Sequence, residues 1–278
     1  MRMYFVLNST NQIIRLTIQK STIMTKITSL LLLILLNTVA IAQVSTQEKQ
    51  ALLDLHKATN GNSWNTTWNL DADIATWEGI TLFRDKVIAI QLVDNNLSGN
   101  LPESLGNLVH LKSLNLYKNN ISGRLPETIT KIKGLKVLNV SFNQLTGELP
   151  SELTSMANLE YIDLFFNQLE GALPQNIGNL KKLRRLSIYS NNFSGQLPAS
   201  ITTLEDLRDL QVSSNDLNGE LPQGLEALTS LKRLSIFDNN FSGIIPEGIN
   251  NMNQLEELTM ASNNFNGNVS GEAVAAND

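Results

Sequence analysis

The chain has 278 residues, a net charge of −5 at neutral pH and 42% hydrophobic residues, enough apolar material for a large buried core. Its acidic balance argues against nucleic acid and anionic lipid surfaces as partners, because both would repel it. The sequence contains no cysteine, which excludes disulfides and thiolate metal sites.

The first 42 residues have the composition of a leader followed by a secretory signal peptide. Lys26 precedes an apolar run, and the small residues Ala40 and Ala42 allow cleavage after residue 42. The unbroken apolar run, residues 30–36, is short for a membrane span, which needs about 20 apolar residues. We therefore predict export to a secreted, periplasmic or cell-surface location, with an uncleaved anchor as the alternative. Cleavage would remove four basic residues and no acids, and would leave a net charge of −9.

Residues 43–86 are predicted to form an N-terminal cap. Ser45 and Glu48 have the spacing of a capping box, which predicts a helix over about residues 46–58 that ends at Asn60-Gly61. We interpret the tryptophans that follow as a lid over the first turn of the fold, with a tryptophan-lined ligand site as the alternative. They are the three tryptophans of the chain, Trp64, Trp68 and Trp77.

Residues 87–278 repeat one unit of 24 residues about eight times. All seven prolines share one position of the unit, and eight glycines and eight asparagines share two others. Such agreement predicts a solenoid of stacked copies. The prolines run from Pro102 to Pro246, the glycines from Gly99 to Gly267 and the asparagines from Asn95 to Asn263, each in steps of 24.

Each position of the unit has a physical role. Apolar residues at positions 1, 4, 6 and 11 indicate a short strand with one buried face, because positions 4 and 6 alternate with polar residues. The asparagine at position 9 is expected to turn inward and pair buried backbone groups of the bend. The glycine at position 13 permits a positive φ, and the proline at position 16 marks the convex back, because it cannot donate to a strand ladder.

The pattern Leu111-x-x-Leu114-x-Leu116-x-x-Asn119 resembles the core of the leucine-rich repeat. The unit length and the Gly-x-Leu-Pro that follows are similar to its plant-type subclass over about residues 87–269. The resemblance implies an α/β repeat solenoid, a curved right-handed coil with a parallel concave sheet, a helical N-terminal cap and a ligand-binding activity. Plant-type caps normally carry a cysteine pair, and its absence here is typical of a cysteine-free, bacterial-like secreted version.

Strand alternation predicts that positions 3, 5 and 7 face the concave side, with position 8 at its edge. Aromatic residues that no repeat position requires gather there between charged residues, which is typical of a recognition patch; packing between neighbouring strands is the alternative. The aromatic residues span about 14 Å at a strand spacing of about 4.8 Å, which suits a short peptide or a few sugar rings. The candidate ligand-binding residues are Tyr117, Lys118, Phe142, Tyr161, Asp163, Phe165, Phe166, Arg185, Tyr189 and Phe237.

The sequence contains no recognisable catalytic motif, and its two histidines, His56 and His110, lie in different segments. We therefore predict an exported, non-catalytic protein, without cofactor or metal, that binds a peptide, protein or glycan on its concave face. One alternative is a structural or adhesive surface module that forms oligomers through an uncapped C-terminal end, where Ser270 replaces proline. Another is an inhibitor of a secreted hydrolase, by analogy at the level of the fold.

Overall fold

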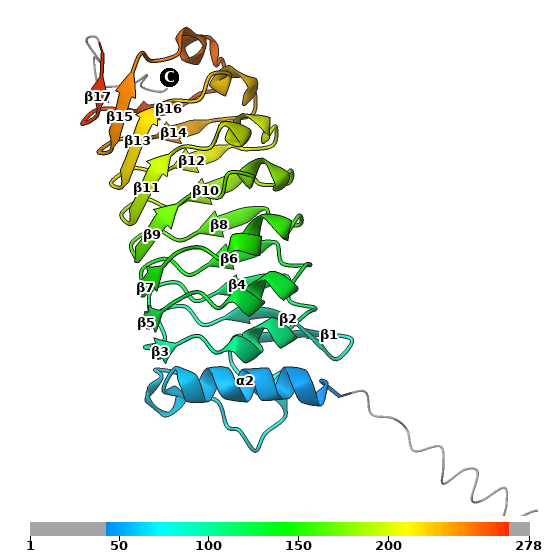
Figure 1. The fold of residues 1–278 in the computed structure, drawn as a ribbon. Helices are drawn as coiled ribbons and strands as arrows, with labels where there is room; N and C mark the ends of the chain where they lie inside the picture. Colours follow the sequence, from blue (N-terminus) through cyan, green and yellow to red (C-terminus); the bar gives the residue numbers. More distant parts are fainter. Residues whose placement is uncertain (1–42, 267–278) are drawn as a thin grey trace, which may run out of the picture. The chain divides into compact units, whose positions relative to one another are not determined.

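The computed structural model describes residues 43–266, which form a continuous stack of turns (Figure 1). The predicted leader and signal peptide, residues 1–42, lie outside the described residues, as do Gly267 and the C-terminal tail to residue 278. Over residues 43–266, every helix is too short or too polar to cross a bilayer.

The N-terminal cap begins with helix α2 (Thr46–Ala58), and its start confirms the predicted capping box. The Ser45 hydroxyl oxygen accepts the Glu48 backbone N–H at 3.3 Å, and the hydroxyl donates to the Glu48 carboxylate at 2.8 Å. Asn60 ends this region in the left-handed conformation, with a φ of 55°. Two short 3-10 helices follow, η1 (Gly61–Ser63) and η2 (Ile74–Thr76).

The strands of residues 43–266 form two sheets, of nine and eight strands. We call the nine-stranded sheet the concave sheet and the eight-stranded one the second sheet. Each full turn gives one strand to each sheet, and all pairs are parallel except β1 with β2. The concave sheet contains β1 (Ile80–Phe83), β2 (Lys86–Gln91), β4 (Ser113–Asn115), β6 (Val137–Asn139), β8 (Tyr161–Asp163), β10 (Arg185–Ser187), β12 (Asp209–Gln211), β14 (Arg233–Ser235) and β16 (Glu257–Thr259).

The second sheet was not predicted from the sequence, and neither was the antiparallel pairing of β1 with β2. Residues around position 13 pair with the next turn, so the glycine segment is itself a strand rather than an open loop. The second sheet contains β3 (Ser98–Asn100), β5 (Asn120–Gly123), β7 (Gln144–Gly147), β9 (Gln168–Ala172), β11 (Asn192–Gln196), β13 (Asp216–Glu220), β15 (Asn240–Gly243) and β17 (Asn264–Phe265).

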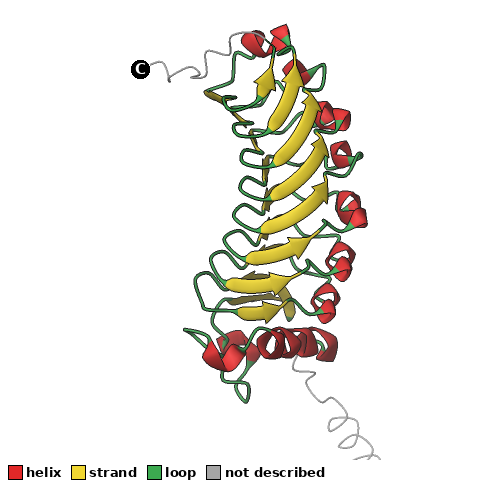
Figure 2. Cartoon of the chain, turned by 60° about the vertical axis from the view of Figure 1, so that its left-hand side comes forward, coloured by secondary structure: helices red, strands yellow, loops and turns green. Residues whose placement is uncertain are grey.

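Short 3-10 helices line the side of the stack that the prolines were predicted to mark (Figure 2). Five of the prolines, including Pro102 and Pro126, are the residue directly before such a helix, where a missing N–H removes no hydrogen bond. The helices are η3 (Glu103–Asn107), η4 (Glu127–Lys131), η5 (Ser151–Ser155), η6 (Ile177–Asn179), η7 (Ala199–Thr203), η8 (Leu225–Ala227) and η9 (Glu247–Asn251).

The apolar positions of the repeat form the core, as predicted. In the unit that starts at Leu111, the side chains of Leu111, Leu114, Leu116 and Ile121 are fully buried. The intervening residues of β4 are half-buried and face the opposite side of the concave sheet. Strand alternation therefore separates a dry interior from an accessible outer row at positions 3, 5 and 7.

The asparagines at position 9 connect successive turns through their side-chain amides. Asn191 donates to the backbone carbonyls of Leu164 and Ile188 at 3.1 and 2.9 Å, and accepts the Leu169 N–H at 3.0 Å. This arrangement confirms the predicted role of position 9, since each amide satisfies backbone groups that the bend leaves without partners. It recurs at Asn119, Asn143, Asn167, Asn215, Asn239 and Asn263.

The three tryptophans are buried in the core of the N-terminal cap. The ring of Trp68 lies 4.9 Å from that of Trp64 and 4.8 Å from that of Trp77, measured between centroids. The indole N–H of Trp68 donates to the Glu78 carbonyl at 2.8 Å. This burial supports the lid, and it argues against a ligand site lined by tryptophan.

Candidate functional site

Five aromatic side chains from four successive turns of the stack form a continuous group, which we call the aromatic cluster. Phe165 and Tyr189 stack almost in parallel, with centroids 4.6 Å apart and an interplanar angle of 7°. Phe142 and Phe166 lie 4.4 Å apart, and Tyr117 meets Phe142 edge-on at 5.4 Å. The cluster comprises Tyr117, Phe142, Phe165, Phe166 and Tyr189.

Two rings of the aromatic cluster are strongly exposed. Phe142 and Phe166 are 38% and 44% exposed, and the other three rings are half-buried. Both phenylalanines occupy position 8 and have left-handed backbones, with φ of 53° and 51°. Bulky residues adopt this conformation only at a cost in free energy. The chain therefore keeps two large apolar side chains in strained and accessible positions.

Next to the aromatic cluster lies a row of alternating charges on β8, β10, β12 and β14, which we call the charged row. The Arg185 Nε lies 3.3 Å from one Asp209 carboxylate oxygen, and the Arg233 Nε pairs with the other. Arg185 also approaches Asp163, with 3.9 Å between a guanidinium nitrogen and the Asp163 Oδ1. Its guanidinium lies over the Tyr161 ring, 5.9 Å from the centroid.

Asp163 and Tyr189 have perturbed acidities where the charged row meets the aromatic cluster. Burial raises the pKa of the Asp163 carboxyl; the Arg185 charge lowers it and the Asp209 charge raises it further. Burial also raises the pKa of the Tyr189 hydroxyl, with smaller contributions from Tyr117 and Asp163. At neutral pH, Tyr189 is therefore a neutral phenol near the buried Asp163 side chain.

The structure brings eight of the ten predicted site residues together, in the aromatic cluster and at the adjacent end of the charged row. Phe237 is separate: it is 41% exposed and contacts no other described aromatic ring. Lys118 is also outside the group, because its ammonium pairs with Asp94 at 2.9 Å on the exposed edge.

Asp209 and Arg233 belong to the charged row but were not among the predicted site residues. The sequence does carry a signal for them. Both occupy position 3, and opposite charges follow one another at that position from Arg185 through Asp209 to Arg233. Because parallel strands stack in register, residues 24 apart at one position are direct neighbours.

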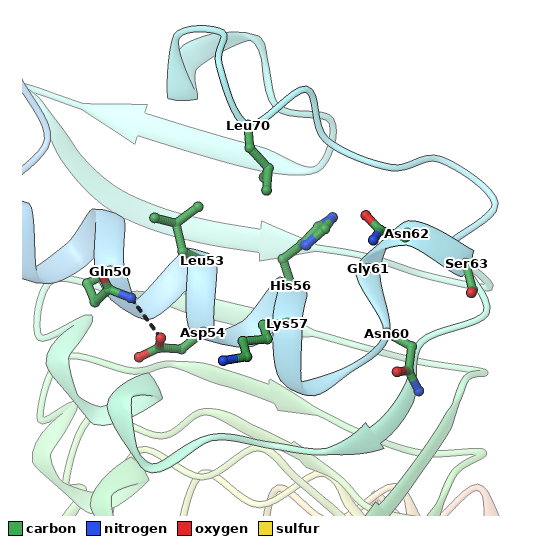
Figure 3. A pocket seen from close by; sticks show the side chains of 10 residues that line it. All are labelled: Gln50, Leu53, Asp54, His56, Lys57, Asn60, Gly61, Asn62, Ser63 and Leu70. Atoms are coloured by element: carbon green, nitrogen blue, oxygen red, sulfur yellow. Dashed lines mark hydrogen bonds between the residues drawn. The ribbon is translucent and has the colours of Figure 1, made fainter.

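A second concavity lies on the cap, away from the concave sheet, and has a volume of about 630 Å³ (Figure 3). Its lining is polar, and Gln50 donates to Asp54 at 2.8 Å at one side. His56 lies at its base, where it is buried, contacts the Thr67 hydroxyl at 3.1 Å and packs against Trp64. Burial lowers the pKa of His56, which keeps the ring neutral. Over residues 43–266, no three His, Asp or Glu side chains are grouped closely enough to hold a metal ion.

Comparison with protein families gives one match. The model of the leucine-rich repeat region matches residues 86–194 and 167–274, which together exceed half of the chain.

Two curated relatives from Arabidopsis thaliana are each 34% identical to this chain over the aligned residues. A probable inactive leucine-rich repeat receptor-like protein kinase aligns over 97 residues, 34% of this chain and 14% of the relative. Receptor-like protein 36 aligns over 70 residues, 25% of this chain and 9% of the relative. The chain thus spans only a small part of these relatives.

Solved structures with a similar fold include receptors in complex with peptides. The complex PEPR1-AtPEP1 has a TM-score of 0.72 at 28% identity, over 80% of this chain and 32% of that one. The plant peptide hormone receptor RGFR1 in complex with RGF2 has a TM-score of 0.62 at 34% identity, over 63% of this chain and 28% of that one. The ectodomain of GASSHO1/SCHENGEN3 from Arabidopsis thaliana, in complex with CASPARIAN STRIP INTEGRITY FACTOR 2, has a TM-score of 0.68 at 25% identity, over 78% and 30%.

Proposed function

We propose, from the premise that this chain belongs to the leucine-rich repeat family, that its concave sheet binds an extended peptide or protein segment without catalysing a reaction. The aromatic cluster is the observation that carries this proposal. It places accessible rings side by side, two of them on strained backbones, at repeat positions where another turn carries Ser213 and Ser214.

The dimensions of the aromatic cluster fit a short peptide. The rings from Tyr117 to Tyr189 cover three strand spacings, about 14 Å at about 4.8 Å per strand. An extended chain rises about 3.3–3.6 Å per residue, so about four residues would cover the cluster. The charged row continues beside the rings and offers polar partners to the same ligand. The similar receptors whose titles name bound peptides support this choice of ligand class.

The location that fits this function is outside the cytoplasm. The apolar run and the small residues before residue 43 are those of a signal peptide. We propose that the chain is exported, so that its concave sheet meets extracellular or envelope peptides.

A triple variant tests the proposed function. The chain is screened against a random 12-residue peptide library, and the strongest binder is titrated against the wild type and Tyr117→Ala/Phe165→Ala/Tyr189→Ala. Central aromatic residues of an interface contribute about 2 kcal/mol or more each, so we expect the triple variant to lose at least about 30-fold in affinity. Phe237→Ala is the matched control, because Phe237 is exposed on the same sheet away from the cluster; its affinity should stay within about twofold of the wild type.

Stability measurements separate recognition from simple packing. Ring pairs contribute about 0.5–1.5 kcal/mol each beyond their buried area. The triple variant removes six ring pairs, so we expect a loss of about 3 kcal/mol or more with a lower Tm, but an unchanged circular dichroism spectrum at 25 °C. Unchanged peptide binding, or collapse of the fold, would instead assign the rings to cross-strand packing.

A further inference from the structure

Asp163 is buried, and within residues 43–266 its one charged partner is distant. The residue is only 7% exposed, and its Oδ1 forms no hydrogen bond within the described part of the chain. The closest cation is the Arg185 guanidinium, at 3.9 Å. An ionised carboxylate in this situation costs free energy, and natural structures normally pair it.

The cations of the charged row are concentrated on the other carboxylate. Arg185 and Arg233 both direct their Nε atoms at Asp209, one to each carboxylate oxygen. The Asp209 Oδ1 also forms no hydrogen bond within residues 43–266, but two guanidinium groups lie closer to Asp209 than the one that Asp163 shares. The row of four carries two acids and two bases, and Glu257 on β16 follows Arg233 in register, so Asp163 is the acid at the end where no second guanidinium of the described residues approaches.

Asp163 is at the end of the charged row beside the aromatic cluster. Asp163 alternates with Tyr161 and Phe165 on the same outer face, two residues from each. Its charge contributes to the raised pKa of Tyr189, so the carboxylate and that phenol are close. Aromatic faces attract cations, most strongly where water is excluded. A carboxylate with one long ion pair, next to aromatic rings, is therefore complementary to a further cationic group.

We propose that Asp163 determines the specificity of the concave site, and that the ligand is a peptide with a cationic group, from a lysine, an arginine or its amino terminus, next to an apolar residue that packs on the aromatic cluster. This inference rests on the proposed function and names the chemistry of its ligand. The net charge of −5 agrees with it, because an acidic chain attracts basic peptides.

The test compares paired peptides on paired proteins. The random 12-residue library, with acetylated amino termini as well as free ones, is screened against the chain. The strongest binder is remade with each cationic group removed in turn: a basic residue is replaced by norleucine, and a free amino terminus is acetylated. We expect one such removal to weaken binding by at least 10-fold. Asp163→Asn should weaken the original peptide by a similar factor and bind the cationic and neutral peptides equally. In Asp163→Asn the two peptides should therefore no longer differ in affinity, and a merely structural role of Asp163 would not remove that difference.

Asp216→Asn is the matched control. Asp216 is exposed on β13 of the second sheet, so the substitution removes the same charge away from the concave sheet. It should leave both affinities and the tenfold difference unchanged. The Tm of Asp163→Asn should equal or exceed that of the wild type, which shows that its loss of binding is not unfolding.

The outcomes separate the two proposals. If the library yields no binder, the proposed function fails and the inference fails with it. If peptides bind but the cationic and neutral forms are equal, or if Asp163→Asn keeps the tenfold difference, the inference is overturned while the proposed function stands.

Discussion

At the scale of single residues, Asp163 gives the stability of the chain a pH dependence whose sign follows from its surroundings. Burial raises the pKa of its carboxyl above the ordinary value of 3.8. The folded chain therefore binds a proton at Asp163 at a pH where the unfolded chain has already released it. The contribution of Asp163 to stability falls as the pH rises from the unfolded pKa to the folded pKa, and it stays unfavourable above that window.

Asp163→Asn should therefore be more stable than the wild type at pH 7, and the difference should shrink as the pH falls to 3. A change of about 1 kcal/mol shifts Tm by about 2–4 °C in a chain of this size, and we expect a rise of that order. Thermal unfolding followed by circular dichroism between pH 3 and 7 measures it, with Asp216→Asn as the exposed control. A difference that is equal at every pH would contradict the assigned cause.

The residue roles that the backbone imposes could be predicted from the sequence. Asn191 and its equivalents turn inward because a bend between stacked turns leaves backbone groups that only an amide can pair from both sides. The glycines of position 13, such as Gly123 with a φ of 75°, occupy a conformation that favours glycine. Strand alternation likewise placed Phe165 and Tyr189 on the outer face.

At the scale of the element, the junction after each concave strand could not be predicted. All eight residues at position 8 have φ between 50° and 59°, although none of them is glycine or asparagine. Residues such as Lys118 and Phe142 give no sign of this conformation, because the stacking of turns imposes it against their own preference.

The second sheet was not predicted for a related reason: its short strands are paired by the stack and lack a clear alternation of apolar residues. The unequal sharing of cations in the charged row depends on side-chain geometry, which no spacing encodes.

The strained junctions allow a test of how much the exposed rings contribute to folding. Phe166→Gly and Ser190→Gly relieve the same left-handed conformation in neighbouring turns, where φ is 51° and 54°. Relief of about 1–2 kcal/mol is partly offset by the backbone entropy of glycine, about 0.5–1 kcal/mol, so Ser190→Gly should be neutral or slightly stabilising. Phe166→Gly also loses the ring contacts of Phe166 with Phe142, Phe165 and Tyr189.

We expect Phe166→Gly to be less stable than Ser190→Gly by about 1.5–4.5 kcal/mol, the contribution of three ring pairs. Urea unfolding of the two variants gives this difference directly, because the backbone terms cancel. A much larger difference would mean that the aromatic cluster is a structural core on the outer face, and it would weaken the case for recognition.

At the scale of the whole molecule, the stack is a one-dimensional assembly in which each turn contacts its neighbours. Backbone bonds connect position 2 of each unit to position 2 of the unit before it, as from Lys136 to Lys112 and from Arg208 to Arg184. In such an assembly, stability is approximately a sum of the terms within turns and between adjacent turns. Damage at one end should therefore fade with distance along the stack.

Trp68→Ala tests this property, because Trp68 is the central ring of the lid and contacts both other tryptophans. Loss of a buried tryptophan costs about 3–5 kcal/mol, so we expect the cap to open locally. Hydrogen exchange measured by mass spectrometry should then show lost protection in α2 and β2, a smaller loss in β4, and none in β12 and β14. Phe237→Ala, at the other end of the concave sheet, is the control and should leave the cap protected. An equal loss of protection from α2 to β14 would show that the turns unfold as one cooperative unit, and the aromatic cluster would then depend on the cap for its order.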